Sequence, residues 1–106
     1  MKFFLLACNL LFFQYCFATV DTIIIPSKAM NKSINAIVIT PKKYKKRNHY
    51  PVTYLLHGYG GNYSNWIKKA PFLQELSTLY NMIIVCPDGA VGSWYIDSPY
   101  IGRAHV

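Results

Sequence analysis

A short, nearly continuous apolar run that ends abruptly in clustered glycines sets the strongest limit on the fold of this chain. Residues 51–56 read PVTYLL, and HGYGG follows at once at 57–61. A strand covered on both faces has such a run, which predicts an inner strand of a parallel sheet. Glycines at its carboxyl end allow the backbone to turn sharply. On glycine content alone, this turn is either a simple strand-to-helix connection or a set of amides that stabilises an oxyanion.

Two strand patterns precede this run. Residues 22–25 form a β-branched run that ends at Pro26, and residues 34–40 form a partly alternating run that ends at Pro41. Runs of β-branched residues bounded by proline are typical of strands. Because only a short segment separates the two runs, we expect an antiparallel pair near a sheet edge.

A helical pattern and another apolar run follow the glycines. Apolar residues recur at helical spacing over 67–80, with Pro71 suited to a first turn and Asn81 suited to a left-handed stop. The run at 82–86 then ends at the sequence PDG. A strand, a helix and a strand in this order imply a right-handed βαβ unit with parallel strands. The predicted fold class is therefore α/β, with a loop over 90–99.

The beginning of the chain has the pattern of a secretory signal peptide. Lys2 provides a positive start, residues 3–17 are almost wholly apolar, and small residues lead to a cleavage site after Ala18. The run is too short to favour a membrane span. We therefore expect residues 1–18 to be removed, and the protein to be secreted or periplasmic with no stable membrane span.

Removal of 18 of the 106 residues would leave 88, and the apolar share of 53% is inflated by the leader. The remaining composition is ordinary, which excludes membrane, collagenous, coiled-coil and disordered classes. Cys86 is then the sole cysteine, so no internal disulfide is possible. No pair of cysteine and histidine has zinc-ligand spacing, and we expect neither a metal nor a cofactor.

Positive charge is concentrated between the second and third predicted strands, in Lys42, Lys43, Lys45, Lys46 and Arg47. Such a cluster is either a patch for nucleic acid or an anionic surface, or a solvated connection whose lysines keep a sheet edge from pairing. Only Tyr44 lies among these residues to stack on a base. We favour the solvated connection and expect no nucleic-acid partner.

Four short motifs occur in the order found in a known group of enzymes. They are LLHGYGG at 55–61 with Trp66 beyond it, IVCPDG at 84–89, SWY at 93–95 and DSP at 97–99. Together they resemble the amino-terminal part of the esterase D-like branch of the α/β-hydrolases, which includes S-formylglutathione hydrolases, feruloyl esterases and the antigen 85 mycolyltransferases. The resemblance implies that residues 19–106 are the amino-terminal portion of a serine-type carboxylic ester hydrolase.

The same resemblance implies roles for individual residues. The backbone amide of Tyr59 would donate to the oxyanion, in a turn shaped by Gly58, Gly60 and Gly61. The second donor in this family is the amide after the nucleophilic serine. A substrate cleft would be lined by the later loop residues Trp94, Tyr95, Asp97 and Ser98. The implied substrate is a small-molecule or carbohydrate-linked ester.

The catalytic triad of that family has no counterpart in this sequence. The triad runs serine, acid, histidine, with the serine in a G-x-S-x-G elbow, and no such elbow occurs here. His57 belongs to the turn motif, where it would brace the loop, and His105 has no nucleophile before it. We therefore assign no nucleophile, acid or base. We expect an incomplete sheet of an antiparallel edge pair followed by a βαβ unit, inactive alone and marginally stable or prone to aggregate.

Two alternatives remain open from the sequence. A non-catalytic secreted module would bind carbohydrate or a polyanion through its aromatic residues and its basic connection. An acyltransferase of the same family would pass the acyl group to an alcohol. The amino-terminal half of the family does not distinguish an acyltransferase from a hydrolase.

Overall fold

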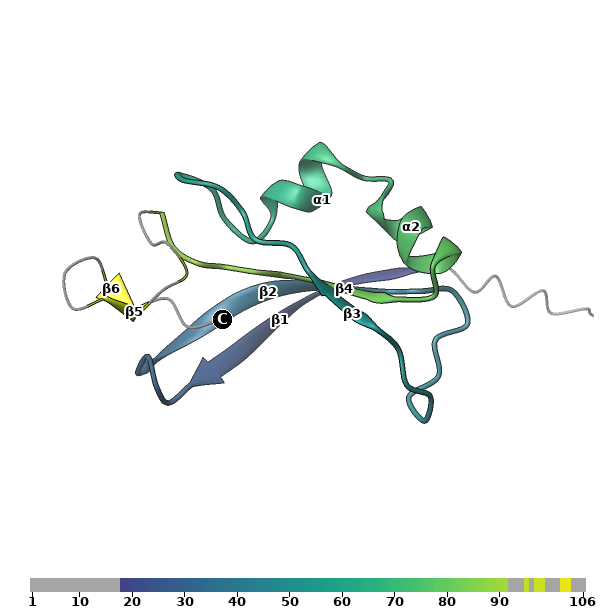
Figure 1. The fold of residues 1–106 in the computed structure, drawn as a ribbon, viewed down its shortest axis with the longest axis horizontal. Helices are drawn as coiled ribbons and strands as arrows, with labels where there is room; N and C mark the ends of the chain where they lie inside the picture. Colours follow the sequence, from purple (N-terminus) through teal and green to yellow (C-terminus); the bar gives the residue numbers. More distant parts are fainter. Residues whose placement is uncertain (1–17, 92–94, 96, 99–101, 104–106) are drawn as a thin grey trace, which may run out of the picture.

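The computed structural model describes residues 18–91, 95, 97–98 and 102–103. Within them, a four-stranded sheet carries two short helices on one face, and a separate two-stranded ribbon follows (Figure 1). The elements are β1 (Thr19–Ser27), β2 (Lys32–Thr40), β3 (Val52–Tyr54), α1 (Asn65–Lys69), α2 (Leu73–Leu79), β4 (Ile83–Pro87), β5 (Asp97–Ser98) and β6 (Gly102–Arg103). The strand order in the larger sheet is β1-β2-β4-β3. The sheet is mixed, since only β3 and β4 run parallel.

The predicted antiparallel pair at a sheet edge is confirmed. β1 pairs with β2 from Thr19 opposite Thr40 to Ser27 opposite Lys32. The prediction that Pro26 ends the first strand is wrong, because Pro26 pairs with Ser33 within the ladder. A proline is tolerated there because β1 is an edge strand, where a missing N–H can face solvent.

The parallel pairing of the βαβ unit is also confirmed, since Val52 to Tyr54 of β3 lie opposite Ile83 to Val85 of β4. The prediction that β3 is an inner strand covered on both faces is wrong for the described residues. β3 lies at the edge of the sheet, and Val52 and Tyr54 are 45% and 61% exposed. An apolar run indicates that a strand can be buried, but its side chains are buried only where other segments pack against them.

The predicted single helix over 67–80 is instead two helices. α1 ends at Lys69, Ala70 leaves the helical region at φ −132° and ψ 66°, and α2 begins at Leu73. Pro71 causes the break, because proline disfavours the helical conformation of the residue before it. The predicted left-handed stop is confirmed at Asn81, whose φ is 50°.

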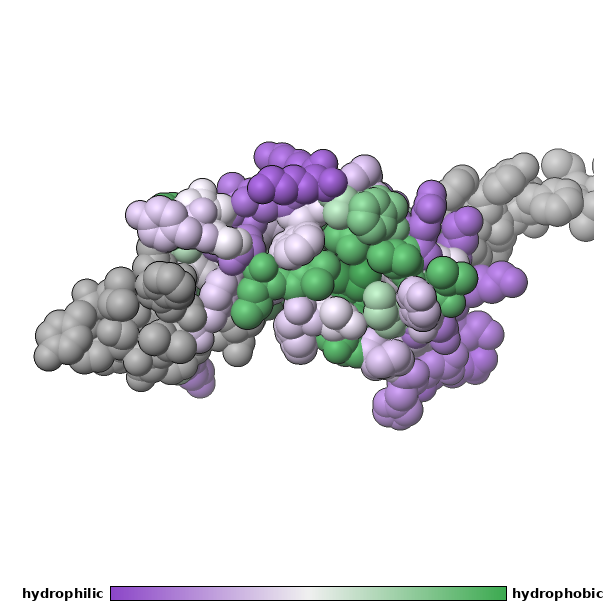
Figure 2. Space-filling model, turned by 45° about the horizontal axis from the view of Figure 1, so that its top comes forward, coloured by the Kyte–Doolittle hydropathy of each residue, from purple (hydrophilic) through white to green (hydrophobic). Residues whose placement is uncertain are grey.

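The hydrophobic core lies between the helices and the two central strands. It consists of Ile37, Ile39, Ala70, Leu73, Ile84 and Cys86. Burial raises the pKa of the Cys86 thiol above its ordinary value. Exposed apolar residues extend from this core onto the surface of β3 and α2, where Figure 2 shows apolar side chains gathered at the middle of the molecule.

The basic segment forms an exposed connection between β2 and β3, as predicted. It has some internal order, because the Lys45 N–H donates to the Tyr50 hydroxyl at 2.9 Å and the rings of Tyr44 and Tyr50 lie 5.2 Å apart. In the part of the chain that the structure describes, no helix is both long enough and apolar enough to cross a membrane.

Candidate functional site

The strand end after β3 forms a tight turn. The Gly61 N–H donates to the Gly58 carbonyl at 3.0 Å, which closes a four-residue turn. Gly60, the third residue of this turn, has a φ of +73°. This arrangement is that of a type II turn, whose third position favours glycine because a side chain is strained at positive φ. Tyr59, the second residue, is 87% exposed at the tip.

The backbone amides around the turn differ in whether they have partners. The His57 N–H donates to the Tyr95 hydroxyl, and the Gly60 N–H donates to the Val91 carbonyl, both at 3.0 Å. The Gly61 N–H closes the turn itself. Among the described residues, no acceptor is found for the N–H groups of Gly58 and Tyr59, and of these two Tyr59 lies at the tip of the turn. Tyr59 therefore presents a backbone donor that an anionic oxygen could accept.

The His57 side chain connects the loops after β3 and β4. It is 6% exposed, its Nδ1 lies 2.8 Å from the Gly58 carbonyl oxygen, and its Nε2 accepts the Gly89 N–H at 2.9 Å. This pattern assigns the neutral tautomer with the proton on Nδ1. Asp88 Oδ1 lies 3.3 Å from Nε2 and accepts the Ala90 N–H at 3.0 Å. Both ring nitrogens are therefore engaged with the backbone, as expected of a residue that braces the turn.

Two glycines lie where an added Cβ would be crowded. A Cβ on Gly61 would lie 2.3 Å from Asn65 Nδ2 and 3.1 Å from the Gly58 oxygen. A Cβ on Gly89 would lie 2.3 Å from Cε1 of Tyr95. Gly58 has open space instead. The sequence assigned a role to the first glycine cluster but none to Gly89, which it included only as the end of the IVCPDG motif.

Tyr95, predicted as a cleft residue, contacts His57 at the start of the turn. Its hydroxyl accepts the His57 N–H at 3.0 Å and lies 3.2 Å from the His57 carbonyl oxygen, to which it donates. Its ring packs edge-on against the His57 ring, with centroids 5.5 Å apart. Burial raises the pKa of Tyr95. The hydrogen bond from the His57 N–H opposes this rise, and the nearby charge of Asp88 adds a smaller increase. The structure therefore brings Tyr95 to the turn itself.

Of the other predicted cleft residues, the structure describes the backbone of two. Asp97 and Ser98 form β5, which pairs with β6. Trp94 lies outside the described residues. Trp66, which the sequence grouped with the turn, donates from Nε1 to the Leu56 carbonyl at 2.9 Å and so ties α1 to the end of β3.

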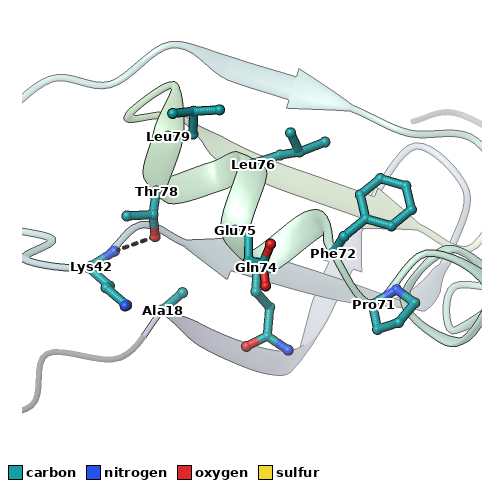
Figure 3. A pocket seen from close by; sticks show the side chains of 9 residues that line it. All are labelled: Ala18, Lys42, Pro71, Phe72, Gln74, Glu75, Leu76, Thr78 and Leu79. Carbon is teal, nitrogen blue, oxygen red and sulfur yellow. Dashed lines mark hydrogen bonds between the residues drawn. The ribbon is translucent and has the colours of Figure 1, made fainter.

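A hollow of about 750 Å³ lies away from this turn, beside α2 (Figure 3). It is lined by Ala18, Lys42, Pro71, Phe72, Gln74, Glu75, Leu76, Thr78 and Leu79. The Lys42 N–H donates to the Thr78 hydroxyl at 3.1 Å at its edge (Figure 3). None of the turn residues lines it, so it belongs to a different part of the surface. No group of three or more His, Cys, Asp or Glu residues suited to a metal occurs in the described segments.

The sheet order, the parallel pair and the glycine turn at its carboxyl end define a partial α/β domain of the α/β-hydrolase type. Residues 27–105 match the family model described as "Putative esterase". Because this match covers more than half of the sequence, the chain belongs to this esterase family, and the resemblance seen in its motifs is confirmed.

Individual relatives agree with this assignment. An acetyl esterase from Caldicellulosiruptor saccharolyticus is 37% identical over 79 residues, which cover 67% of this chain and 29% of the relative. A solved ferulic acid esterase is 27% identical, with a TM-score of 0.69 over 83% of this chain and 38% of that chain. An S-formylglutathione hydrolase from Staphylococcus aureus, 15% identical, shares the fold with a TM-score of 0.60 over 81% of this chain and 35% of its own. The chain spans about a third of the length of these relatives.

Proposed function

We propose that this chain supplies the oxyanion-binding part of an exported, serine-type carboxylic ester hydrolase. The observation that carries the proposal is the Tyr59 N–H at the exposed tip of the turn. Like the Gly58 N–H, it has no acceptor among the described residues, whereas the amides of His57, Gly60 and Gly61 each have one. Membership of the esterase family supports the reaction class. The names of the acetyl esterase and the ferulic acid esterase support a small ester as substrate. A carbohydrate-linked ester is included in the proposal on the motif resemblance alone.

In the proposed reaction, a serine hydroxyl attacks the ester carbonyl and an acyl-enzyme forms. The carbonyl oxygen becomes negatively charged as the tetrahedral intermediate develops, and the fixed Tyr59 N–H donates to it. Such a preorganised donor lowers the barrier because it does not reorient during the reaction. The serine, acid and base are not assigned to any residue of this sequence, which has no G-x-S-x-G elbow. By itself the chain would then have no turnover.

The remaining parts of the proposal concern processing and the cleft. Residues 1–18 would be a signal peptide cleaved after Ala18, and β1 begins at the next residue, Thr19. Residues 19–106 would be the amino-terminal portion of the esterase domain. The segment that holds Trp94, Asp97 and Ser98 would border the substrate, with no cofactor and no nucleic acid involved.

The test uses a chimera in which this chain replaces the matching segment of the acetyl esterase. Tyr59→Pro removes the N–H, and proline suits the second position of a type II turn. Tyr59→Ala removes the exposed side chain but keeps the N–H. We expect kcat for 4-nitrophenyl acetate to fall about 10²- to 10³-fold in Tyr59→Pro, as on loss of one oxyanion donor, with little change in Tyr59→Ala. Equal activities of the two variants would contradict the assignment.

The chain alone provides a second test. Incubation with a serine-directed fluorophosphonate should label none of its serines. A labelled serine, identified by mass spectrometry, would show that the nucleophile lies within this sequence.

A further inference from the structure

We propose that Tyr95 is a positioning residue whose hydroxyl holds the strand end before Tyr59 and so fixes the direction of the Tyr59 N–H. The inference rests on the function proposed above for Tyr59. It assigns Tyr95 a role different from that of a cleft residue that contacts substrate. Its basis is the hydrogen-bond ladder between β3 and β4 and the place where that ladder stops.

The register of β3 with β4 predicts what His57 would contact if the ladder continued. Tyr54 lies opposite Val85, and the Leu55 N–H donates to the Val85 carbonyl at 2.9 Å. Continuing this register places His57 opposite Asp88. In a parallel ladder, the His57 N–H would donate to the Pro87 carbonyl, and its carbonyl would accept from the Gly89 N–H.

Neither Pro87, at the end of β4, nor Gly89 beyond it makes these bonds with the His57 backbone. The Gly89 N–H donates to the His57 imidazole, and the His57 N–H donates to the Tyr95 hydroxyl. A backbone N–H and C=O at this strand end would otherwise lack protein partners. The Tyr95 hydroxyl serves both, accepting at 3.0 Å and donating at 3.2 Å. One phenol therefore replaces a rung of the sheet, two residues before Tyr59.

Neighbouring residues leave room for the Tyr95 ring and pack against it. Gly89 lacks the Cβ that would lie 2.3 Å from the Tyr95 ring, and the ring packs against the His57 imidazole. Tyr95 itself has a φ of 57°, a conformation that costs a non-glycine residue free energy. The Tyr95 backbone therefore adopts a left-handed conformation while its hydroxyl forms hydrogen bonds with the His57 backbone.

The test measures amide exchange in the full chain by mass spectrometry and by ¹H–¹⁵N correlation spectra. Tyr95→Phe removes the hydroxyl and keeps the ring. Tyr80→Phe, at an exposed tyrosine after α2, is the matched control. We expect the His57 N–H to exchange roughly tenfold faster in Tyr95→Phe, the change that loss of one hydrogen bond produces. The Tyr59 amide peak should move as well, while the core amides of Ile37 and Ile84 keep their rates.

Gly89→Ala gives an independent readout, because its Cβ should displace the Tyr95 ring and reproduce the same local change at His57. Unchanged exchange at His57 in either variant would overturn the inference, and so would a uniform rise that includes Ile37 and Ile84. None of these measurements depends on ester hydrolysis. Failure of the oxyanion proposal would appear only in the Tyr59→Pro chimera, so the two outcomes are distinguishable.

Discussion

Gly58 and Gly61 belong to the same turn but differ in what surrounds them. Gly61→Ala would place a methyl group 2.3 Å from Asn65 Nδ2 and 3.1 Å from a backbone oxygen, whereas Gly58→Ala meets open space. We expect Gly61→Ala to lower the free energy of unfolding by about 1 to 3 kcal/mol, the range for overpacked sites. Gly58→Ala should leave it nearly unchanged. Urea denaturation of both variants checks this, and equal midpoints would contradict the crowding at Gly61.

Residue types in the sequence identified which positions form the turn but not how each is held there. The glycine cluster and its histidine could be predicted because few residues tolerate so sharp a strand end. The partners of Tyr95 and the requirement for Gly89 could not, because both depend on contacts between segments far apart in the sequence. Such contacts leave no local pattern.

At the level of elements, the sequence predicted those whose signals are local. The β1–β2 pair, the parallel β3–β4 pair and the stop at Asn81 follow from apolar runs and their end residues. The break at Pro71 is also a local signal, and the prediction of one helix over 67–80 missed it. The other two errors arose where the neighbours of an element decide its form. Pro26 remains within a strand because its edge is free, and β3 is exposed because no described segment covers its outer edge.

The end of α2 allows an element-scale test. Asn81 has a φ of 50°, which asparagine tolerates better than alanine does. We expect Asn81→Ala to lower the free energy of unfolding by about 1 kcal/mol and Asn81→Gly to leave it unchanged or slightly raised. Thermal unfolding followed by circular dichroism would measure both. An equal loss in the two variants would show that the asparagine side chain, and not its backbone conformation, stabilises this end.

The four-stranded sheet has two edge strands, β1 and β3. Unpaired edges next to apolar side chains favour association between copies. Ile24 on β1 is 69% exposed, so Ile24→Lys should reduce self-association, measured by light scattering, with little effect on unfolding. Ile37→Lys, at a residue that is 5% exposed, is the control and should abolish folding. If Ile24→Lys leaves self-association unchanged, the copies associate through another surface, such as β3.

The strand order also determines when each part of the molecule can assemble during synthesis. The β1–β2 hairpin joins neighbouring segments and can form as soon as both strands have left the ribosome. β3 has β4 as its partner, and β4 is made only after both helices. When the Tyr59 turn leaves the ribosome, the segments that hold it by hydrogen bonds have not yet been made. It acquires its final shape only after Gly89, Val91 and Tyr95 have been translated, so a ribosome that pauses before these codons would hold a nascent chain with a formed hairpin and an unformed turn.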